Sequence, residues 1–463
     1  MCDACGYFYS LESSQSRCGK CGGELEYVWD EEYLKSVEFT GEFKFWRYKP
    51  VIPPVQKQIS LGEGGTPLQK SQRLAEHLGL KELFLKDETR NPTNSFKDRA
   101  AALIVSDAAG KGYSSIICAT NGNHGASLAA YSAKTDLNCH LIVPKRLDLG
   151  KLAQMMVYDA QIVESGETIE DSIKKAVTLE HEMGWYQATT ELNPLSIEAV
   201  KTISYEIVEQ GGAPDWLLVA MGSGVTATSL WKGFKEMEIA GKISALPKLI
   251  GVQAAGCSPI TQAFFSGSED YKPVEKGDTE AIAIRVTNPM FGSQALRAIR
   301  ESHGLAVTVS DEEMLQAGKD TARLEGIFPE PASASTIACI RQLKDEGRVI
   351  TSDKIVCVIT SSGLKTDDIL QNISKRRKSP GLGSMLTTKE KILRLVLGGE
   401  TYGYEVWKAL GKGMTIGAVY QHISDLEKRG LISSSLKGKR RYYEITERGH
   451  RVLDALNDLQ ALL

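Results

Sequence analysis

The chain has 463 residues, of which 42% are hydrophobic and 24% are charged. This composition is typical of an ordinary globular protein with about two to four domains, and it excludes low-complexity and fibrous chains. No apolar run reaches the length of a membrane-spanning helix, and the first residues lack a signal-peptide pattern. We therefore expect a cytoplasmic protein that makes no membrane contact.

The net charge of −3 hides two regions of opposite sign. Residues 375–463 contain 17 Lys and Arg against 9 Asp and Glu, whereas residues 1–374 contain 38 against 49. Regions so different in charge rarely form one domain, and a basic region favours a polyanionic partner such as DNA. The sequence therefore predicts a separate basic domain at the carboxyl end.

The nine cysteines fall into two groups. Four of them form two Cys-x-x-Cys pairs near the amino end, at Cys2, Cys5, Cys18 and Cys21. Two such pairs on a short hairpin supply four soft ligands in tetrahedral array, which is typical of structural zinc. Two disulfides are the alternative, and a cytoplasmic setting disfavours them. We predict a zinc ribbon over residues 1–30. The others are expected to be inert core thiols, four in strand-like runs and Cys339 in a helix-like stretch: Cys118, Cys139, Cys257, Cys339 and Cys357.

Between about residues 61 and 368, strand-like apolar runs alternate with helical patterns. The runs lie at 115–118, 139–143, 216–219, 249–252 and 354–359. This alternation predicts an α/β fold with a mostly parallel sheet covered by helices on both faces. Ligands bind at the carboxyl ends of the strands in such a fold, so the loops at those ends are the candidate sites.

Three of these loops carry chemically useful groups. Residues 120–125 (Thr-Asn-Gly-Asn-His-Gly) precede a helix expected over 126–134, and residues 222–226 (Gly-Ser-Gly-Val-Thr) precede one expected over 227–236. Free amides at a helix start favour carboxylates and phosphates. Residues 360–363 place a hydroxyl cluster after the last strand. Each loop alone is also explained by tight strand-to-helix packing, but three on one sheet form a stronger pattern.

Lys97 occupies an unusual position for a lysine. It follows a turn at Asn91-Pro92 and begins a small-residue helix, with Ser95 as a good N-cap residue. The positive end of the helix dipole disfavours a cation there. A lysine held as a neutral imine would avoid that cost, which suggests a Schiff base. A solvated surface lysine is the alternative for this residue taken alone.

Four stretches resemble the threonine synthase family, which are pyridoxal-phosphate enzymes of the tryptophan-synthase-β fold type, also called fold type II. They are residues 61–68, the Lys97 segment, 150–154 and 330–335. The resemblance implies a catalytic domain over 31–373 with two subdomains and the cofactor between them. It implies that Lys97 is the Schiff-base lysine, Asn123 contacts the 3′-oxygen and Thr360 faces the pyridine nitrogen. The implied phosphate loop consists of Gly222, Ser223, Gly224, Val225 and Thr226.

The same resemblance implies conversion of O-phospho-L-homoserine and water to L-threonine and phosphate. The substrate carboxylate would bind at Thr120, Asn121 and Gly122. The substrate phosphate would bind at Lys151 and the amides of Asn94 and Ser95. For Lys151 and Ser95, a solvated lysine and a helix cap are the alternatives.

The chain also departs from the family pattern. Ser196 stands where an arginine is usual, Asn94 where glycine is common and Asn121 where serine is common. These changes leave related enzymes open, namely a cysteate synthase acting on O-phosphoserine and sulfite, or a threonine dehydratase. His124 is either a base or a packed histidine. A transcription regulator whose pyridoxal-phosphate domain only senses a ligand is the alternative from another class.

The basic region is expected to form a winged helix over residues 385–463, after a basic linker at 374–384. Helical patterns at 388–397, 403–410 and 415–429 precede two strands at 431–436 and 441–446 and a final helix from 447. Residues 402–405, 419–420 and 426–432 resemble PadR-type regulators. Dimerisation or regulation without DNA is the alternative role, and we expect a homodimer. The candidate DNA contacts are Thr415, Tyr420, Gln421, Lys437, Lys439 and Arg440.

Overall fold

The computed structural model describes residues 1–10, 17–366, 382–399, 401–411, 414–437 and 440–461. The chain divides into two compact units, residues 1–369 and 370–463, and each is described by itself. The predicted linker at 374–384 lies mostly outside the described residues. No helix within the described ranges is long and apolar enough to cross a membrane.

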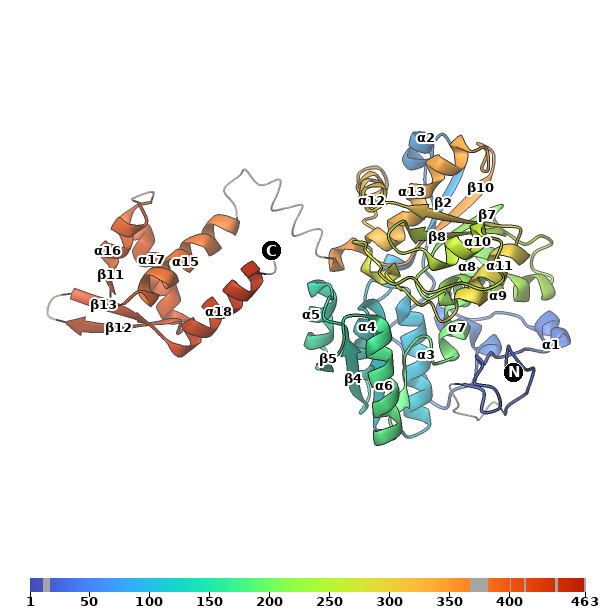
Figure 1. The fold of residues 1–463 in the computed structure, drawn as a ribbon, viewed down its shortest axis with the longest axis horizontal. Helices are drawn as coiled ribbons and strands as arrows, with labels where there is room; N and C mark the ends of the chain where they lie inside the picture. Colours follow the sequence, from blue (N-terminus) through green and yellow to red (C-terminus); the bar gives the residue numbers. More distant parts are fainter. Residues whose placement is uncertain (11–16, 367–381, 400, 412–413, 438–439, 462–463) are drawn as a thin grey trace. The chain divides into compact units, whose positions relative to one another are not determined.

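The larger sheet of the first unit has six strands in the order β1-β2-β10-β7-β8-β9 (Figure 1). All neighbours run parallel except the short edge strand β1. Strand β10 lies between β2 and β7 and pairs with both. The strands are β1 Leu68–Lys70, β2 Glu82–Asp87, β7 Trp216–Ala220, β8 Lys248–Ala254, β9 Leu305–Val309 and β10 Lys354–Ile359.

Helices cover both faces of this sheet, because its strands are apolar on both faces. Leu218 and Cys357 pack with α2, α12 and α13 on one face, whereas Leu217 and Val356 pack with α8, α9, α10 and α11 on the other. The helices are α2 Arg73–Leu78, α8 Thr202–Gly211, α9 Val225–Ile239, α10 Pro259–Phe265, α11 Gly292–Glu301, α12 Asp311–Glu325 and α13 Pro331–Asp345.

A smaller parallel sheet, in the order β5-β4-β3-β6, forms a second group of elements in this unit (Figure 1). Its strands are β3 Ser115–Ala119, β4 Asn138–Val143, β5 Gln161–Glu164 and β6 Tyr186–Gln187. Helices α3 Lys97–Gly110, α4 Asn123–Ser132, α5 Leu149–Val157, α6 Ile169–Met183 and α7 Leu195–Val200 accompany it. Shorter pieces are α1 Glu31–Ser36 and the 3₁₀ turns η1 Phe45–Val51, η2 Glu88–Arg90, η3 Ile282–Ile284 and η4 Gly363–Lys365.

The predicted α/β architecture is confirmed, with differences in detail. All five apolar runs are strands, and they lie in two mostly parallel sheets, in agreement with the parallel sheets and two subdomains that the family resemblance implied, whereas the alternation alone predicted one sheet. Helix α4 begins at Asn123 and α9 at Val225, both earlier than predicted. Cys257 is buried but follows β8 instead of lying in a strand, so that part of the cysteine prediction is wrong.

The second unit is a winged helix, as predicted. Helices α15 Leu382–Leu397, α16 Gly403–Ala409 and α17 Ile416–Lys428 precede the antiparallel hairpin β12 Ile432–Lys437 and β13 Arg440–Ile445. Strand β11 Thr401–Tyr402 adds to β13, and α18 Glu447–Ala461 follows. Val406, Val419 and Ile423 are among the buried residues of its own core. Helix α15 begins within the predicted linker.

Candidate active site

A cavity in the first unit lies at the carboxyl ends of β3, β7 and β10, where the sequence placed the candidate loops. The predicted residues that line it are Lys97, Thr120, Asn121, Asn123, Gly222, Ser223, Thr226 and Thr360. The predicted residues that are not among its lining are Asn94, Ser95, Gly122, Lys151, Gly224 and Val225. The structure therefore brings together groups from three strand ends and from the starts of three helices, α3, α4 and α9.

Lys97 is the first residue of α3, and its side chain faces the cavity. Its Nζ lies 3.5 Å from the Thr190 hydroxyl and 4.9 Å from the centre of the Phe96 ring, and no carboxylate pairs with it in the described residues. Burial lowers the pKa of Lys97 from its ordinary value of 10.5, although the carboxylate of Glu191 opposes this effect. A lysine in this environment is more often neutral and nucleophilic than a surface lysine.

The segment before Lys97 is joined to the end of β10. Ser95 pairs with Ser361 as an isolated bridge, and the amide of Ser362 donates to the carbonyl of Asn94 at 3.0 Å. The N-cap residue of α3 is Phe96, so the prediction of Ser95 at that position is wrong. The Ser95 hydroxyl still accepts the Lys97 amide at 3.4 Å. The segment that precedes α3 is thus held against the residues that follow β10.

Asn94 adopts a left-handed conformation, with φ 60°, at the turn before Lys97. Its side chain is exposed and donates to the carbonyl of Thr89 at 3.1 Å. Glycine adopts this conformation without a steric cost, and asparagine is among the residues that tolerate it best. Asparagine in place of glycine at position 94 is therefore compatible with the turn before Lys97.

Residues 222–226 join β7 to α9. A Cβ at Gly224, where φ is 94°, would lie 2.3 Å from the carbonyl oxygen of Phe291, so glycine is required there. The Phe291 amide donates to the carbonyl of Ser223 at 2.9 Å and fixes the loop. Gly222, Ser223 and Thr226 face the cavity at the start of a 15-residue helix. The free amides and the dipole there favour an anion such as a phosphate.

A buried polar cluster forms another wall of the cavity. Asn123 Nδ2 donates to both carboxylate oxygens of Glu330 at 3.1 Å, while Asn123 Oδ1 is buried without a partner among the described residues. Lys151 Nζ lies 3.2 Å from Glu330 and 2.6 Å from Asp148. Burial would lower the pKa of Lys151, but Glu330 and Asp148 outweigh it and raise the pKa. Lys151 is therefore a fully paired cation that lies behind Gly122.

Thr360 directly follows strand β10 and contributes a hydroxyl to the cavity. Its Oγ1 lies 2.7 Å from the hydroxyl of Ser333, which also accepts the Ser361 amide at 3.0 Å. This contact orients the Thr360 hydroxyl without placing a charge beside it.

Thr190 and Glu191 line the cavity next to Lys97, but they were not predicted from the sequence. They follow β6, which has only two residues and therefore gives no apolar run. Glu330 was part of a recognised stretch, but its contacts with Asn123 and Lys151 join residues far apart in the chain. No signal in a single sequence predicts those contacts.

His124 is the packed histidine of the two alternatives. It is buried, and its Nε2 lies 2.9 Å from the carbonyl oxygen of Ala188. Burial, helped by the positive charge of Lys97, lowers the pKa of His124 to about 3. The imidazole is consequently neutral at physiological pH, and Nε2 donates its proton to Ala188.

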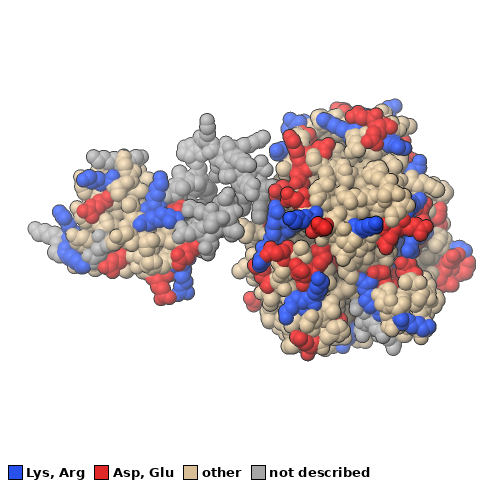
Figure 2. Space-filling model, in the orientation of Figure 1, with Lys and Arg blue, Asp and Glu red and all other residues tan. Residues whose placement is uncertain are grey.

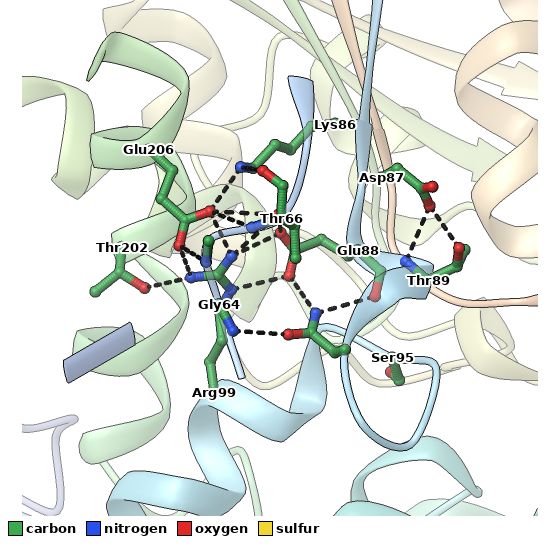
Figure 3. A network of polar contacts seen from close by, with 12 residues as sticks. Gly64, Thr66, Lys86, Asp87, Glu88, Thr89, Ser95, Arg99, Thr202 and Glu206 are labelled. Atoms are coloured by element: carbon green, nitrogen blue, oxygen red, sulfur yellow. Dashed lines mark hydrogen bonds and ion pairs between the residues drawn. The ribbon is translucent and has the colours of Figure 1, made fainter. Parts of the chain in front are cut away.

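A fully buried ion network supports the helix that carries Lys97 (Figure 3). Arg99 contacts Glu88 at 2.8 Å and Glu206 at 2.6 Å, and Lys86 contacts Glu206 at 2.6 Å. Thr66 donates to Glu88 at 2.5 Å. Burial alone would raise the pKa of Glu206, but Arg99 and Lys86 lower it to about 2. The charges of Arg99 and Lys86 thus balance those of two carboxylates. Arg99 belongs to α3 and lies two residues after Lys97.

The four amino-terminal cysteines converge, as predicted. Their Sγ atoms all lie within 4.8 Å of one another, with Cys2 and Cys21 3.5 Å apart and Cys5 and Cys18 3.7 Å apart. All four are free thiols, which excludes the alternative of two disulfides. Four sulfur ligands at this spacing match a tetrahedral zinc site.

In the winged helix, the candidate DNA contacts occupy α17 and the hairpin. Thr415 caps α17 by accepting the Ala418 amide, and Tyr420 and Gln421 are exposed. Lys437 and Arg440 are exposed at the hairpin tip, whereas Lys439 lies outside the described residues. Figure 2 shows basic and acidic side chains interspersed on the visible face of this unit.

Comparisons with known proteins agree with this geometry. Residues 59–361 match the family described as pyridoxal-phosphate dependent enzyme. The chain is 41% identical over 377 residues to the threonine synthase of Methanocaldococcus jannaschii, covering 79% of this chain and 93% of that protein. It is 38% identical over 370 residues to the threonine synthase of Methanosarcina acetivorans, covering 79% and 91%.

Solved structures of lower identity share the fold. Maize serine racemase has a TM-score of 0.57 and 20% identity, covering 67% of this chain and 92% of that chain. The processed form of threonine deaminase isoform 2 from Solanum lycopersicum has a TM-score of 0.56 and 20% identity, covering 67% and 82%. Residues 392–455 match the PadR-like family of transcriptional regulators. The chain therefore belongs to the pyridoxal-phosphate-dependent enzymes, is homologous to threonine synthase, and carries a PadR-like domain at its carboxyl end.

Proposed function

We propose that the chain converts O-phospho-L-homoserine and water to L-threonine and phosphate. The observation that carries the proposal is Lys97, an amine without a carboxylate partner among the described residues, in a cavity that also contains the start of α9. Identity of 41% to a threonine synthase over most of the chain supports the same substrate. Lys97, Asn123, Thr360 and the 222–226 loop are proposed to bind the cofactor.

The residues of the cavity fit pyridoxal phosphate. The start of α9 suits its phosphate. The Oδ1 of Asn123 is buried without a partner among the described residues, and a hydroxyl group on the cofactor ring would provide one. The neutral hydroxyl of Thr360 suits a pyridine nitrogen that is not forced to carry a proton. When bound, the cofactor supplies an electron sink that makes hydrogens on neighbouring carbons of the substrate acidic.

In the proposed reaction, Lys97 moves protons on the substrate. Its lowered pKa suits an amine that accepts the proton from Cα, gives it up, and can then accept a proton from Cβ. Phosphate leaves from Cγ, a proton returns to Cγ, and water adds at Cβ. Asn121 and Thr120 face the cavity beside the start of α4, where they and nearby amides would hold the substrate carboxylate. Binding of the substrate carboxylate at this position would orient the Cα–H bond toward Lys97.

One observation favours a second candidate, a dehydratase acting on threonine. Lys97 is the only cation among the lining residues of the described chain, and Lys151 is already paired with two carboxylates. A substrate phosphate would therefore depend on amides and hydroxyls, or on a shift of Lys151, whereas threonine has no phosphate to bind. Cysteate synthesis from O-phosphoserine and sulfite is the third reaction to compare.

One experiment separates these reactions. Purified full-length protein is incubated with O-phosphohomoserine, with O-phosphoserine plus sulfite, and with threonine alone, and phosphate and amino acids are quantified. Phosphate and threonine in equal amounts from the first substrate support the proposal. Products only from the second or third substrate would replace it, and no turnover of any substrate would favour a ligand-sensing regulator. Lys97→Ala protein is the control for catalysis at this site.

We also propose roles for the amino-terminal cysteines and for the winged helix. Cys2, Cys5, Cys18 and Cys21 hold a structural zinc ion in a ribbon over residues 1–30. The winged helix over 385–463 binds DNA, with α17 in the major groove and the hairpin on phosphates. A homodimer in the cytoplasm would supply the two copies that paired half-sites need.

A further inference from the structure

Glu191 is a cavity residue that the proposed roles leave unused. It lies in a turn after β6 in which the amides of Leu192 and Asn193 both donate to the carbonyl of Thr189 at 3.0 Å. The hydroxyl of Thr189 accepts the amide of Ala119, at the end of β3, at 2.9 Å. The turn is thus hydrogen-bonded to the sheet, and it places the Glu191 side chain on the cavity wall beside Thr190.

The other carboxylate on the wall is already paired, and the histidine is a weak base. Glu330 is held by Asn123 and Lys151. His124 donates from Nε2 to Ala188, and although its Nδ1 has no partner among the described residues, burial lowers the pKa of this imidazole to about 3. By contrast, the carboxylate of Glu191, a partly buried residue, has no hydrogen-bond or ion-pair partner within the described residues. Glu191 also acts electrostatically on Lys97 without forming an ion pair with it. The cavity therefore presents an amine and a separate, unoccupied carboxylate.

The proposed reaction needs two groups of this kind. Lys97 serves the substrate carbons, but the last step also requires that a water molecule lose a proton while its oxygen bonds to Cβ. One amine cannot deliver a proton to Cα and accept one from water in the same step. We propose that Glu191 is a further catalytic residue, the general base that activates this water. The inference rests on the proposed function.

The step balances in atoms and charge. After phosphate has left and Cγ has gained a proton, the substrate portion is 2-aminobut-2-enoate, with a double bond between Cα and Cβ. A water O–H bond breaks, its proton passes to the Glu191 carboxylate, and a C–O bond forms at Cβ. The electron pair of the double bond takes a proton from the Lys97 ammonium at Cα. The product is threonine, Lys97 is again a neutral amine, and the proton on Glu191 passes through solvent to the phosphate that has left.

Loss of the base has a specific chemical consequence. If water does not add at Cβ, 2-aminobut-2-enoate is released, and hydrolysis in solution converts it to 2-oxobutyrate and ammonium. Phosphate release precedes this branch, so it is unaffected by the loss. The ratio of threonine to 2-oxobutyrate therefore reports on Glu191 separately from cofactor binding and phosphate departure.

The test is Glu191→Gln in the full chain with bound cofactor and O-phosphohomoserine. A general base typically contributes roughly 10²- to 10⁴-fold, so we expect the ratio of threonine to 2-oxobutyrate to fall by at least about tenfold while phosphate release continues. Glu191→Asp keeps a carboxylate and should restore part of the ratio. Glu182→Gln, at an exposed position of α6, is the matched control and should keep the wild-type ratio.

The outcomes distinguish the inference from the proposed function. If the wild-type protein releases no phosphate from O-phosphohomoserine, the proposed function fails and the inference fails with it. If wild-type protein makes threonine and Glu191→Gln keeps the same product ratio, only the inference is overturned. Should Glu191→Gln not fold, Glu191→Ala with added formate replaces it. Formate restoring threonine formation would support the role of the carboxylate, and absence of rescue in folded protein would contradict it.

Discussion

The backbone amide of Phe96 donates to the carbonyl oxygen of Thr360 at 2.9 Å. This bond joins the residue before Lys97 to the end of β10, although the two residues are far apart in the chain. Lys365 adds a second link, because its Nζ donates to the carbonyl of Thr93 at 2.7 Å. The amine and the hydroxyl that face the cavity therefore lie on two segments that are hydrogen-bonded to each other.

Replacement of Lys97 tests the covalent attachment of the cofactor. Lys97→Ala removes the amine, so the purified protein should lose the visible absorption of lysine-bound cofactor and the mass increase after borohydride reduction. Activity should fall by at least about 10³-fold. Lys174→Ala, at an exposed position of α6, should keep both signals. A retained mass increase in the Lys97 variant would refute the assignment.

The buried ion network makes a prediction about stability. Arg99→Met leaves the carboxylates of Glu88 and Glu206 buried, with only Lys86 to compensate for both. Removal of one partner from a buried network typically costs about 3–5 kcal/mol in the free energy of unfolding. Urea unfolding of the full chain measures it. Arg297→Met breaks a partly exposed pair with Asp3 and should cost at most about 1 kcal/mol. Equal costs for the two variants would contradict the argument.

Lys365 makes a prediction about pH. Burial lowers the pKa of this lysine from 10.5 to about 8. Between these values the unfolded chain binds more protons than the folded chain, so the contribution of Lys365 to stability rises with pH. The free energy of unfolding of the wild type relative to Lys365→Met should therefore increase from pH 8 to 10.5, by at most about 3 kcal/mol. Urea unfolding at a series of pH values measures the difference, and a flat difference would show that Lys365 titrates normally.

The cysteine cluster makes a prediction about metal content. Protein purified without chelators should contain about one zinc ion per chain, and Cys18→Ser should lose it because the remaining three thiolates bind less tightly. Elemental analysis measures the metal, and a thermal scan should show a lower melting temperature in the variant. Gln294 and Arg297 of α11 contact Glu24 and Asp3, so the ribbon should also protect this helix from hydrogen exchange. Equal zinc content in both proteins would exclude the site.

The winged helix makes a prediction about salt dependence. Arg440→Ala removes a positive charge at the hairpin tip. If the hairpin contacts phosphates, affinity for a mixed-sequence DNA duplex should fall, and the slope of log affinity against log salt should decrease by about 1. Fluorescence anisotropy at several salt concentrations provides both values. Glu444→Ala, an exposed change on the same strand, should not weaken binding, and an unchanged slope for Arg440→Ala would place the DNA contact elsewhere.

Much of the fold was predictable because its signals are local. Strands buried on both faces give apolar runs, and the loops after β3, β7 and β10 could be named from the strands alone. Glu191 was not predictable, because β6 is too short to mark the turn that carries it. The pairing of Lys151 with Glu330 is equally hidden, since it depends on how two distant helices meet. Ser95 was assigned as a cap because its pairing with Ser361 is invisible in one sequence.

The central place of β10 in the larger sheet also bears on how the chain is made. Strands β2 and β7 pair with β10 and not with each other, so residues 354–359 join two otherwise separate parts of the sheet. During synthesis from the amino end, the enzyme unit cannot complete this sheet until those residues have left the ribosome. A nascent chain interrupted before residue 354 would expose two unpaired strand edges and would be a substrate for chaperones or proteases.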